Sequence, residues 1–387
     1  MSEWKTVRLG DVCEIQSGGT PSRSKTEYWK NGTIPWVKIG DFSGKYLNKT
    51  TEHITQKGLE NSSAKLFSKG TILYSIFATL GEATILNIDA TTNQAIAGIK
   101  IKDKSSIDID YLFAYLKSLK EEVNRIGRGV AQNNINLSIL KAFTFPLPPL
   151  ETQKQIAKQL NKCTTLLAKH KQMLEKYDTL IKSRFIEMFG DNPIENGKWK
   201  VEKLEDVCDL ITDGTHKTPN YQQKGIRFIS AKNIINGKID LTDTKFITEE
   251  EYKQIQKRCR VEKNDVLLTK SGSLGSSAII DFDIPIGLFE SLAVIKYKRN
   301  LLNGIFVKEL LSAESSQKQF NNGVKGIAIK HLHLNVIAAL KIPIPPIKLQ
   351  NDFATFVQQI DKSKFAVQKS LEKAETLYKS LMQRYFA

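Results

Sequence analysis

The chain carries the same sequence plan twice, and this internal repeat constrains its fold more than any other feature. WKTVRLGDVCEIQSGGT (4–20) matches WKVEKLEDVCDLITDGT (199–215) 195 positions later. The block 129–157 matches the block 326–354 at a spacing of 197, and two shorter blocks match in the same order between them. Because the spacing changes by only a few residues, the repeat predicts two similar units that differ by small loop insertions.

Each copy reads as a globular α+β domain followed by a long helix. Short β-branched and aromatic runs, such as GTILYSIF (70–77), alternate with turns and helical stretches. FPLPPL (145–150) and IPIPPI (342–347) then end the domains, because proline cannot donate to a strand ladder and keeps the preceding residue extended. The predicted boundaries are 1–148 for the first domain, 149–190 for the first helix, 191–346 for the turn and second domain, and 347–387 for the second helix.

Apolar residues in the two predicted helices recur at alternating steps of four and three, the heptad spacing of a coiled coil. Because the two seams match, we expect the helices to pair in antiparallel fashion and to hold the domains apart as an internal pseudo-twofold repeat. Alternatively, each helix packs only on its own domain, although roughly 55 Å of helix at 1.5 Å per residue would extend beyond it. The seam residues are Ile156, Leu160, Leu167, Leu174 and Ile181, and Phe353, Val357, Ile360, Leu371 and Tyr378. The predicted fold class is therefore α+β, with two similar globular α+β domains separated by two long antiparallel coiled-coil helices.

The charge of the chain favours a polyanionic partner. Lys and Arg number 57 against 41 Asp and Glu, a formal net charge of +16 spread along the sequence. Neutralising phosphates releases counterions and gives affinity for any nucleic acid, which makes nucleic acid the leading candidate. The alternative is a lysine-rich surface that is merely solvated.

The cysteines and the amino terminus predict a soluble, cytoplasmic protein. Cys13, Cys163, Cys208 and Cys259 form no C-x-x-C pair and are expected to be reduced core residues. The amino terminus has no apolar signal segment, and no stretch approaches the roughly 18 apolar residues of a membrane span.

The common catalytic constellations are incomplete in this sequence. GDFSGKY (40–46) has the wrong glycine spacing for a phosphate-binding loop and ends in Tyr46, where a Mg²⁺-binding Ser or Thr is required. DNPI (191–194) has no aromatic residue after its proline, and His331 and His333 have no third metal ligand nearby. We therefore expect a binding protein without a cofactor or metal.

Polar side chains that suit base edges and phosphates gather in corresponding loops of the two copies. Arg and Lys suit guanine, Asn and Gln suit adenine, and Lys also binds phosphates. Matching scaffolds with different polar residues are what two different short DNA sequences would require, although any one of these residues is equally an ordinary loop residue. The candidate DNA-binding residues are Thr20, Ser22, Arg23, Lys25, Lys38, Arg128, Gln132, Asn133, Asn134 and Asn136 in the first copy, and His216, Lys217, Thr218, Lys232, Asn233, Lys270, Lys330, His331 and His333 in the second.

These motifs carry a resemblance to a known family. GGTPSRSKTEYWKNGTIPWVKIGDF, ATLGEATI, TNQAI and NINLSILKAFTFPLPPLETQKQIA, repeated more loosely in the second copy, resemble the specificity subunit of type I restriction-modification systems over essentially the whole chain. The resemblance implies two target recognition domains joined by conserved spacer helices that pair antiparallel. It also implies a bipartite double-stranded DNA target, and docking of two methyltransferase subunits and of restriction subunits that carry the chemistry.

Two other classes of function stay open at this point. A self-contained restriction or methylation enzyme would need an unfamiliar catalytic site, and a coiled-coil scaffold for proteins would make the basic charge incidental. Helices of roughly 50 Å agree with the resemblance, because they suit half-sites about one to one and a half DNA turns apart.

Overall fold

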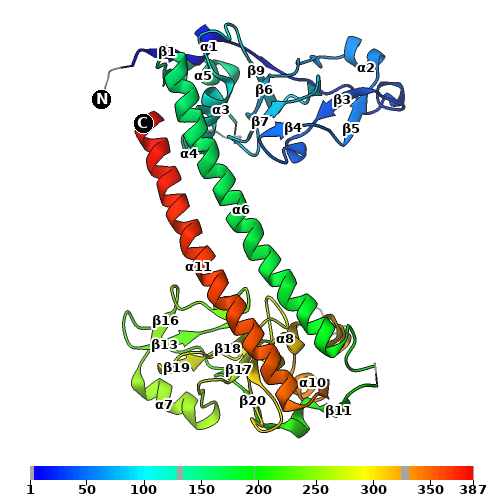
Figure 1. Ribbon diagram of the computed structural model, residues 1–387, viewed down its shortest axis with the longest axis vertical. Coiled ribbons are helices and arrows are strands. Elements are labelled where there is room, and N and C mark those ends of the chain that lie inside the picture. Colours follow the sequence, from blue (N-terminus) through cyan, green and yellow to red (C-terminus); the bar gives the residue numbers. More distant parts are fainter. Residues whose placement is uncertain (1–3, 129–133, 196, 324–330, 387) are drawn as a thin grey trace. The chain divides into compact units, whose positions relative to one another are not determined.

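The computed structural model describes residues 4–128, 134–195, 197–323 and 331–386. It divides into two compact units, the first formed by residues 1–171 and 369–387 and the second by residues 172–368 (Figure 1). Both divisions fall inside the long helices α6 (Leu150–Phe189) and α11 (Ile347–Phe386). Each unit therefore contains one globular domain and a part of both helices.

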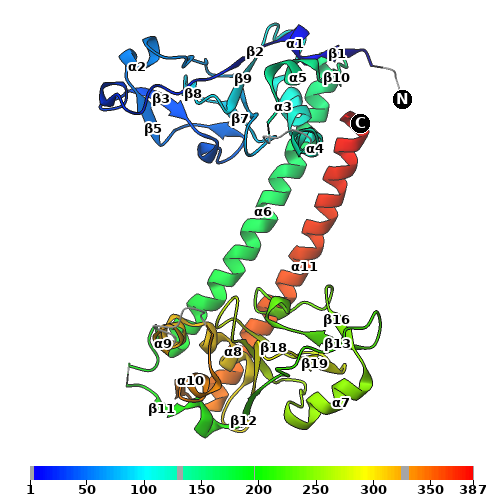
Figure 2. The same cartoon turned by 180° about the vertical axis from the view of Figure 1, so that it is seen from behind.

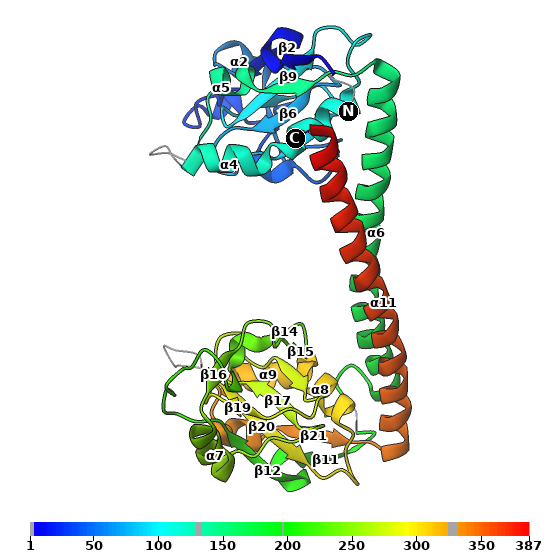
Figure 3. The same ribbon diagram turned by 90° about the vertical axis from the view of Figure 1, so that its left-hand side faces the viewer.

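The globular part of the first unit is built on a five-stranded sheet in the order β2-β9-β6-β7-β4, of which Figure 3 shows β2, β9 and β6 side by side. A three-stranded sheet, β5-β3-β8, and the pair β1-β10 complete it. The strands are β1 (Thr6–Arg8), β2 (Cys13–Ser17), β3 (Ile34–Val37), β4 (Tyr46–Leu47), β5 (Glu52–Ile54), β6 (Ile72–Ser75), β7 (Ala83–Leu86), β8 (Thr91–Thr92), β9 (Ile96–Ile101) and β10 (Thr144–Pro146). The helices are α1 (Leu9–Val12), α2 (Gln56–Glu60), α3 (Ile109–Ser118), α4 (Lys120–Arg128) and α5 (Leu137–Ala142), with 3-10 turns η1 (Thr26–Tyr28) and η2 (Ile39–Asp41).

The second unit repeats this plan with the sheets β12-β20-β17-β18 and β16-β13-β19, the pair β11-β21 and an added hairpin, β14-β15. Its helices α8, α9 and α10 gather near the last turns of α6 (Figure 2). The strands are β11 (Lys200–Lys203), β12 (Cys208–Asp213), β13 (Ile226–Ile229), β14 (Ile234–Ile235), β15 (Lys238–Ile239), β16 (Lys245–Ile247), β17 (Val266–Thr269), β18 (Ser277–Ile279), β19 (Ile286–Leu288), β20 (Leu292–Tyr297) and β21 (Lys341–Ile344). The helices are α7 (Glu249–Arg258), α8 (Gly304–Ser312), α9 (Glu314–Gly323) and α10 (Leu334–Ala338), with 3-10 turns η3 (Leu204–Val207) and η4 (Ala231–Asn233). The common strand order confirms the predicted repeat of two α+β domains.

One strand breaks the uniform sequence alignment of the two copies. β12 shifts register against β20 between Cys208 and Leu210, whereas β2 pairs with β9 without a shift. A bulge adds one residue to the strand, so the residues that follow it in β12 are matched one position further along. From Leu210 to Gly214 the spacing is therefore 196 rather than 195, and Gly214 corresponds to Gly18 and not to Gly19. The same tight contact marks both glycines, because a Cβ on either would collide with main-chain oxygens of β8 or β19.

A buried glutamine fastens each long helix to its globular domain. The Gln153 side chain donates to the carbonyls of Ser106 and Pro148, at 2.9 and 2.8 Å, and accepts from the Asp108 N–H at 2.9 Å. Gln350 makes the equivalent contacts in the second unit, with the carbonyls of Leu301 and Pro345 and the N–H of Asn303. In both copies the strand ends at the prolines and the helix begins directly after them, as the sequence predicts.

The two long helices run antiparallel within each unit. In the first unit Gln159 contacts Tyr385 at 2.8 Å, and further along α6 Lys171 lies 3.8 Å from Glu375 on α11. In the second unit Asp178 pairs with Lys364 at 2.5 Å. The expected antiparallel pairing is thus confirmed in each unit, and the alternative of helices packed only on their own domains is wrong.

Aromatic side chains at the helix ends enter the globular cores. Phe386, at the end of α11, has its ring 5.3 Å from that of Tyr111 in the first unit. Phe189, at the end of α6, lies 4.8 Å from Phe306 and 5.5 Å from Phe353 in the second unit. Each domain therefore buries the start of one long helix and the end of the other.

The seam residues are covered to different degrees, and the cysteines are buried. Ile156, Leu160, Ile181, Phe353, Val357 and Leu371 are buried, and Leu167, Leu174, Ile360 and Tyr378 are half-buried. All four cysteines are free and buried, as expected, and burial raises the pKa of Cys13, Cys208 and Cys259 to about 12. Within the described ranges, no helix has the length and apolarity to span a bilayer.

Candidate nucleic-acid interface

In the first domain, the guanidinium of Arg23 lies over two tryptophan rings. Its carbon is 3.6 Å from the centroid of Trp29 and 4.8 Å from that of Trp36, which is a cation–π arrangement. The same guanidinium pairs with Glu52 on β5 at 2.6 Å, and Lys38 contacts the other Glu52 oxygen at 2.5 Å. The hydrogen bond from Lys38, helped by Arg23 and opposed by partial burial, lowers the pKa of Glu52. Two cations of the predicted interface therefore share one carboxylate.

Other predicted residues of the first domain have local partners. The Thr20 hydroxyl donates to Gln94 Oε1 at 2.5 Å, and Lys25 donates to the Tyr28 hydroxyl at 3.0 Å. The Ser22 hydroxyl is exposed and hydrogen-bonded to the hydroxyl of Ser24 at 2.8 Å. These side chains and Arg23 occupy the loop between β2 and β3, so the structure brings this group together.

The third predicted group of the first domain is only partly described. Asn136 caps α5 by accepting the Ile139 N–H at 2.8 Å, which gives its side chain a structural role. Asn134 forms an isolated antiparallel bridge with Phe77 in the loop after β6. Gln132, Asn133 and the side chain of Arg128 lie outside the described residues.

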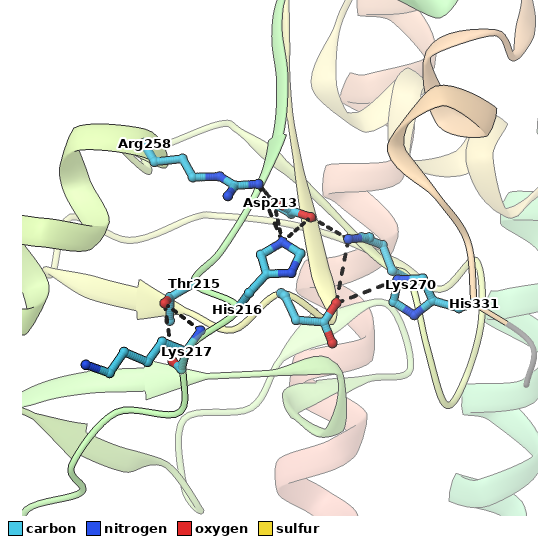
Figure 4. A network of polar contacts seen from close by, with 8 residues as sticks. Asp213, Thr215, His216, Lys217, Arg258, Lys270 and His331 are labelled. Carbon is cyan, nitrogen blue, oxygen red and sulfur yellow. Dashed lines mark hydrogen bonds and ion pairs between the residues drawn. The ribbon is translucent and has the colours of Figure 1, made fainter.

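A network of charged side chains occupies the matching region of the second domain (Figure 4). The Asp213 carboxylate is buried at the end of β12, where it accepts from Lys270 and Arg258, both at 2.5 Å, and contacts His216 at 3.3 Å. Burial raises the pKa of Asp213, but the hydrogen bond and charge of Lys270, together with Arg258 and His216, outweigh it and hold the pKa below its ordinary value. Lys270 is itself buried, so the two opposite charges neutralise each other inside the domain.

This network borders an open hollow on the second domain. Glu290 Oε2 lies 3.7 Å from Lys270 Nζ and 3.6 Å from His331 Nε2, and the rings of His331 and His333 are 5.3 Å apart. Burial lowers the pKa of His331, and Lys270 and His333 add to this against the opposing charge of Glu290. The lining residues are Asp213, His216, Arg258, Lys270, Glu290, His331, His333, Leu334 and Asn335.

The other predicted residues of the second domain separate into exposed and structural ones. Lys217 and Thr218 are exposed, and Lys232 forms an exposed pair with Asp243 at 3.2 Å. Asn233 is buried and donates to the carbonyls of Asp240 and Asp243, so its amide supports the loop around η4. Lys330 lies outside the described residues.

Three residues of this network, Asp213, Arg258 and Glu290, are not among the residues predicted from the sequence. Asp213 precedes the Gly-Thr pair that marks the loop, but the uniform spacing of 195 matched it to Gly18. Arg258 ends α7, 45 residues away in sequence. Within the described ranges, no group of three or more His, Cys, Asp or Glu side chains is placed to hold a metal ion.

Comparisons with known proteins identify the family. The model of the "Type I restriction modification DNA specificity domain" matches residues 1–176 and again residues 196–375. The chain belongs to this family. It is thus the specificity type of subunit, which recognises DNA and does not itself carry out catalysis.

Similarity to individual proteins, in sequence and in structure, supports this family membership. The chain is 26% identical to the type I restriction enzyme MjaIX specificity subunit of Methanocaldococcus jannaschii, over 92% of this chain and 87% of that protein. The S subunit of a type I restriction-modification system from M. genitalium has the same fold, with a TM-score of 0.62 at 16% identity over 99% of this chain and 96% of that one. A chain from a solved type I restriction-modification complex matches with a TM-score of 0.59, at 16% identity over 100% and 98% of the two chains.

Proposed function

We propose that this specificity subunit recognises a bipartite double-stranded DNA target, with one half-site bound by each globular domain. The recognition domains are residues 1–148 and 191–346, and the spacer helices 149–190 and 347–387 set the distance between the half-sites through the seam residues. Two methyltransferase subunits dock on the chain to modify the target, restriction subunits join them, and the assembly works in the cytoplasm.

One observation supports this proposal above the others. The two domains share strand order and main-chain contacts, yet the first presents Arg23 on a tryptophan platform and the second presents the hollow around Asp213 and Lys270. One scaffold with two different polar surfaces suits two different base sequences, because hydrogen bonds to base edges carry the specificity.

The residues proposed to contact DNA are the predicted ones whose side chains remain accessible. In the first domain these are Thr20, Ser22, Arg23, Lys25, Lys38 and Asn134; in the second they are His216, Lys217, Thr218, Lys232, His331 and His333. Asn233 and Lys270 are buried and hold their loops in place from within the second domain, through main-chain carbonyls and through Asp213. Asn136 is exposed, but its side-chain oxygen is engaged in capping α5, so it also has a structural role.

Methylation sequencing tests the proposal. The chain is produced with its methyltransferase partner in a host lacking other methylation, and modified adenines are mapped across the genome. The proposal predicts two short specified blocks separated by unspecified bases, and one continuous block would contradict it. Methylation or cleavage of DNA by the chain alone would instead establish a self-contained enzyme.

A further inference from the structure

The main chains of the two domains make corresponding hydrogen bonds and strand pairings at the candidate interface. Ile135 donates to the Ile76 carbonyl at 3.0 Å in the first domain, and Leu332 donates to the Lys270 carbonyl at 2.8 Å in the second. The ladder registers of β2, β6 and β9, compared with those of β12, β17 and β20, set the remaining correspondences. The matched positions are Ser17, Thr20, Ile76, Gln94 and Asn134 in the first domain, and Asp213, His216, Lys270, Glu290 and His331 in the second.

Every one of these five positions is uncharged in the first domain and ionisable in the second. Asp213 and Lys270 replace a serine and an isoleucine, and they satisfy each other within the domain. The Asp213 carboxylate already forms ion-pair contacts with Lys270, Arg258 and His216. Because Lys270 and Asp213 are both buried and compensate each other's charge, removing either is costly, and the pair is a fixed support for the residues that line the hollow.

Glu290 differs from the supporting pair because its carboxylate remains open. Its side chain is 23% exposed at the border of the hollow. Lys270 and His331 lie near it, at 3.7 and 3.6 Å, but both distances exceed a hydrogen bond, and the described part of the chain gives the carboxylate no other hydrogen-bond donor. A carboxylate can only accept, so Glu290 presents an unused acceptor to the hollow.

We propose that Glu290 determines specificity in the second half-site by accepting a hydrogen bond from the exocyclic amine of a cytosine or adenine. In the major groove these amines are the donors that bases present. Lys270 and, through it, Asp213 act as positioning residues that hold the carboxylate in place. The matched Gln94 is an amide whose oxygen is already bonded to Thr20, so the first domain offers different chemistry at this position. This inference rests on the proposed function of the chain.

The test is Glu290→Gln in the complex with the methyltransferase subunit, assayed for methylation on a library with both half-sites randomised. The amide has nearly the same shape and adds a donor. We expect discrimination at one base pair of the second half-site to fall about tenfold or more, with the first half-site unchanged. The identity of that base pair separates cytosine from adenine.

Glu250→Gln is the matched control, since Glu250 is exposed in the first turn of α7 and should leave both half-sites unchanged. An unchanged second half-site in Glu290→Gln, or equal losses in both halves, overturns the inference while leaving the bipartite target intact. If Glu290→Gln abolishes methylation, Glu290→Asp is assayed on the same library. A changed base preference at one base pair of the second half-site supports the inference, and an unchanged preference overturns it. A wild-type complex without a split target counts against the proposed function instead.

Discussion

The side-chain oxygen of Gln153 accepts a hydrogen bond from the main-chain N–H of Asp108 at 2.9 Å, which ties the first turn of α6 to the N-cap of α3. Gln350 and Asn303 repeat this contact between α11 and α8. Both glutamines are fully buried, and each satisfies three main-chain groups that water does not reach. One buried side chain therefore fixes the first turn of each long helix to the loops of its domain.

Replacing Gln153 with leucine tests this tie. Three buried main-chain groups would lose their partner, so the free energy of unfolding of the first unit should fall by about 2–4 kcal/mol. Gln155→Leu, on the exposed side of the same helix, should change it by less than about 0.5 kcal/mol. Hydrogen exchange of the β6 and β9 amides measures both variants, and equal effects would refute the proposed role of Gln153.

The buried pair Lys270–Asp213 should be far more costly to break than an exposed pair. Lys270→Met leaves the Asp213 carboxylate buried without its principal partner, and we expect a loss of about 3–5 kcal/mol in the second unit. Lys263 pairs with Asp283 at 3.2 Å on the surface, so Lys263→Met should cost at most about 1 kcal/mol. Exchange of the β17 and β20 amides reports the difference, and similar losses in the two variants would contradict the account.

The same carboxylate predicts an acid sensitivity of the second unit. The folded pKa of Asp213 lies below its ordinary value, so its stabilising contribution is complete above the unfolded pKa of about 3.9 and is lost as the pH falls through the folded pKa. Asp213→Asn should therefore differ most from wild type at neutral pH and progressively less below pH about 4. Unfolding free energies of both proteins between pH 2 and 7 check this, and a constant difference across the range would be inconsistent with it.

Glu52 should restrain DNA binding by the first domain, because it occupies both Arg23 and Lys38. Glu52→Gln removes the competing charge, and we expect nonspecific DNA affinity to rise several-fold with a salt slope steeper by about one to two phosphates. Glu14→Gln, an exposed change on β2, is the control. Titration of DNA binding against salt measures the slope, and the same slope in all three proteins would exclude a role for Arg23 and Lys38 at phosphates.

Three features of the fold can be predicted from the sequence: the repeat, the proline-bounded helices and the antiparallel pairing. They depend on periodic apolar residues and on prolines, whose backbone preferences are fixed. The bulge after Cys208 does not follow, since one extra residue in a short strand leaves the alternation of side chains plausible at either spacing. That single residue matches Asp213 with Ser17 and thereby changes which side chains correspond between the domains.

The site is less predictable than the fold for a physical reason. The amide side chains of Asn136 and Asn233 could form the hydrogen bonds that recognise adenine. Short polar side chains near loop ends serve equally well as helix caps and loop supports, however, and these are the contacts that the two residues make. Arg258 reaches Asp213 only because α7 folds back toward β12, and nothing local in the sequence indicates that contact.

Under the proposed function, each domain recognises its own half-site on a common scaffold. Replacing residues 198–346 with a second copy of residues 1–148, followed by methylation sequencing of the complex with the methyltransferase subunit, tests it most directly. We expect a target whose two specified blocks both equal the first half-site, arranged as an inverted repeat because the spacer helices are antiparallel. A target that keeps the original second block would contradict it.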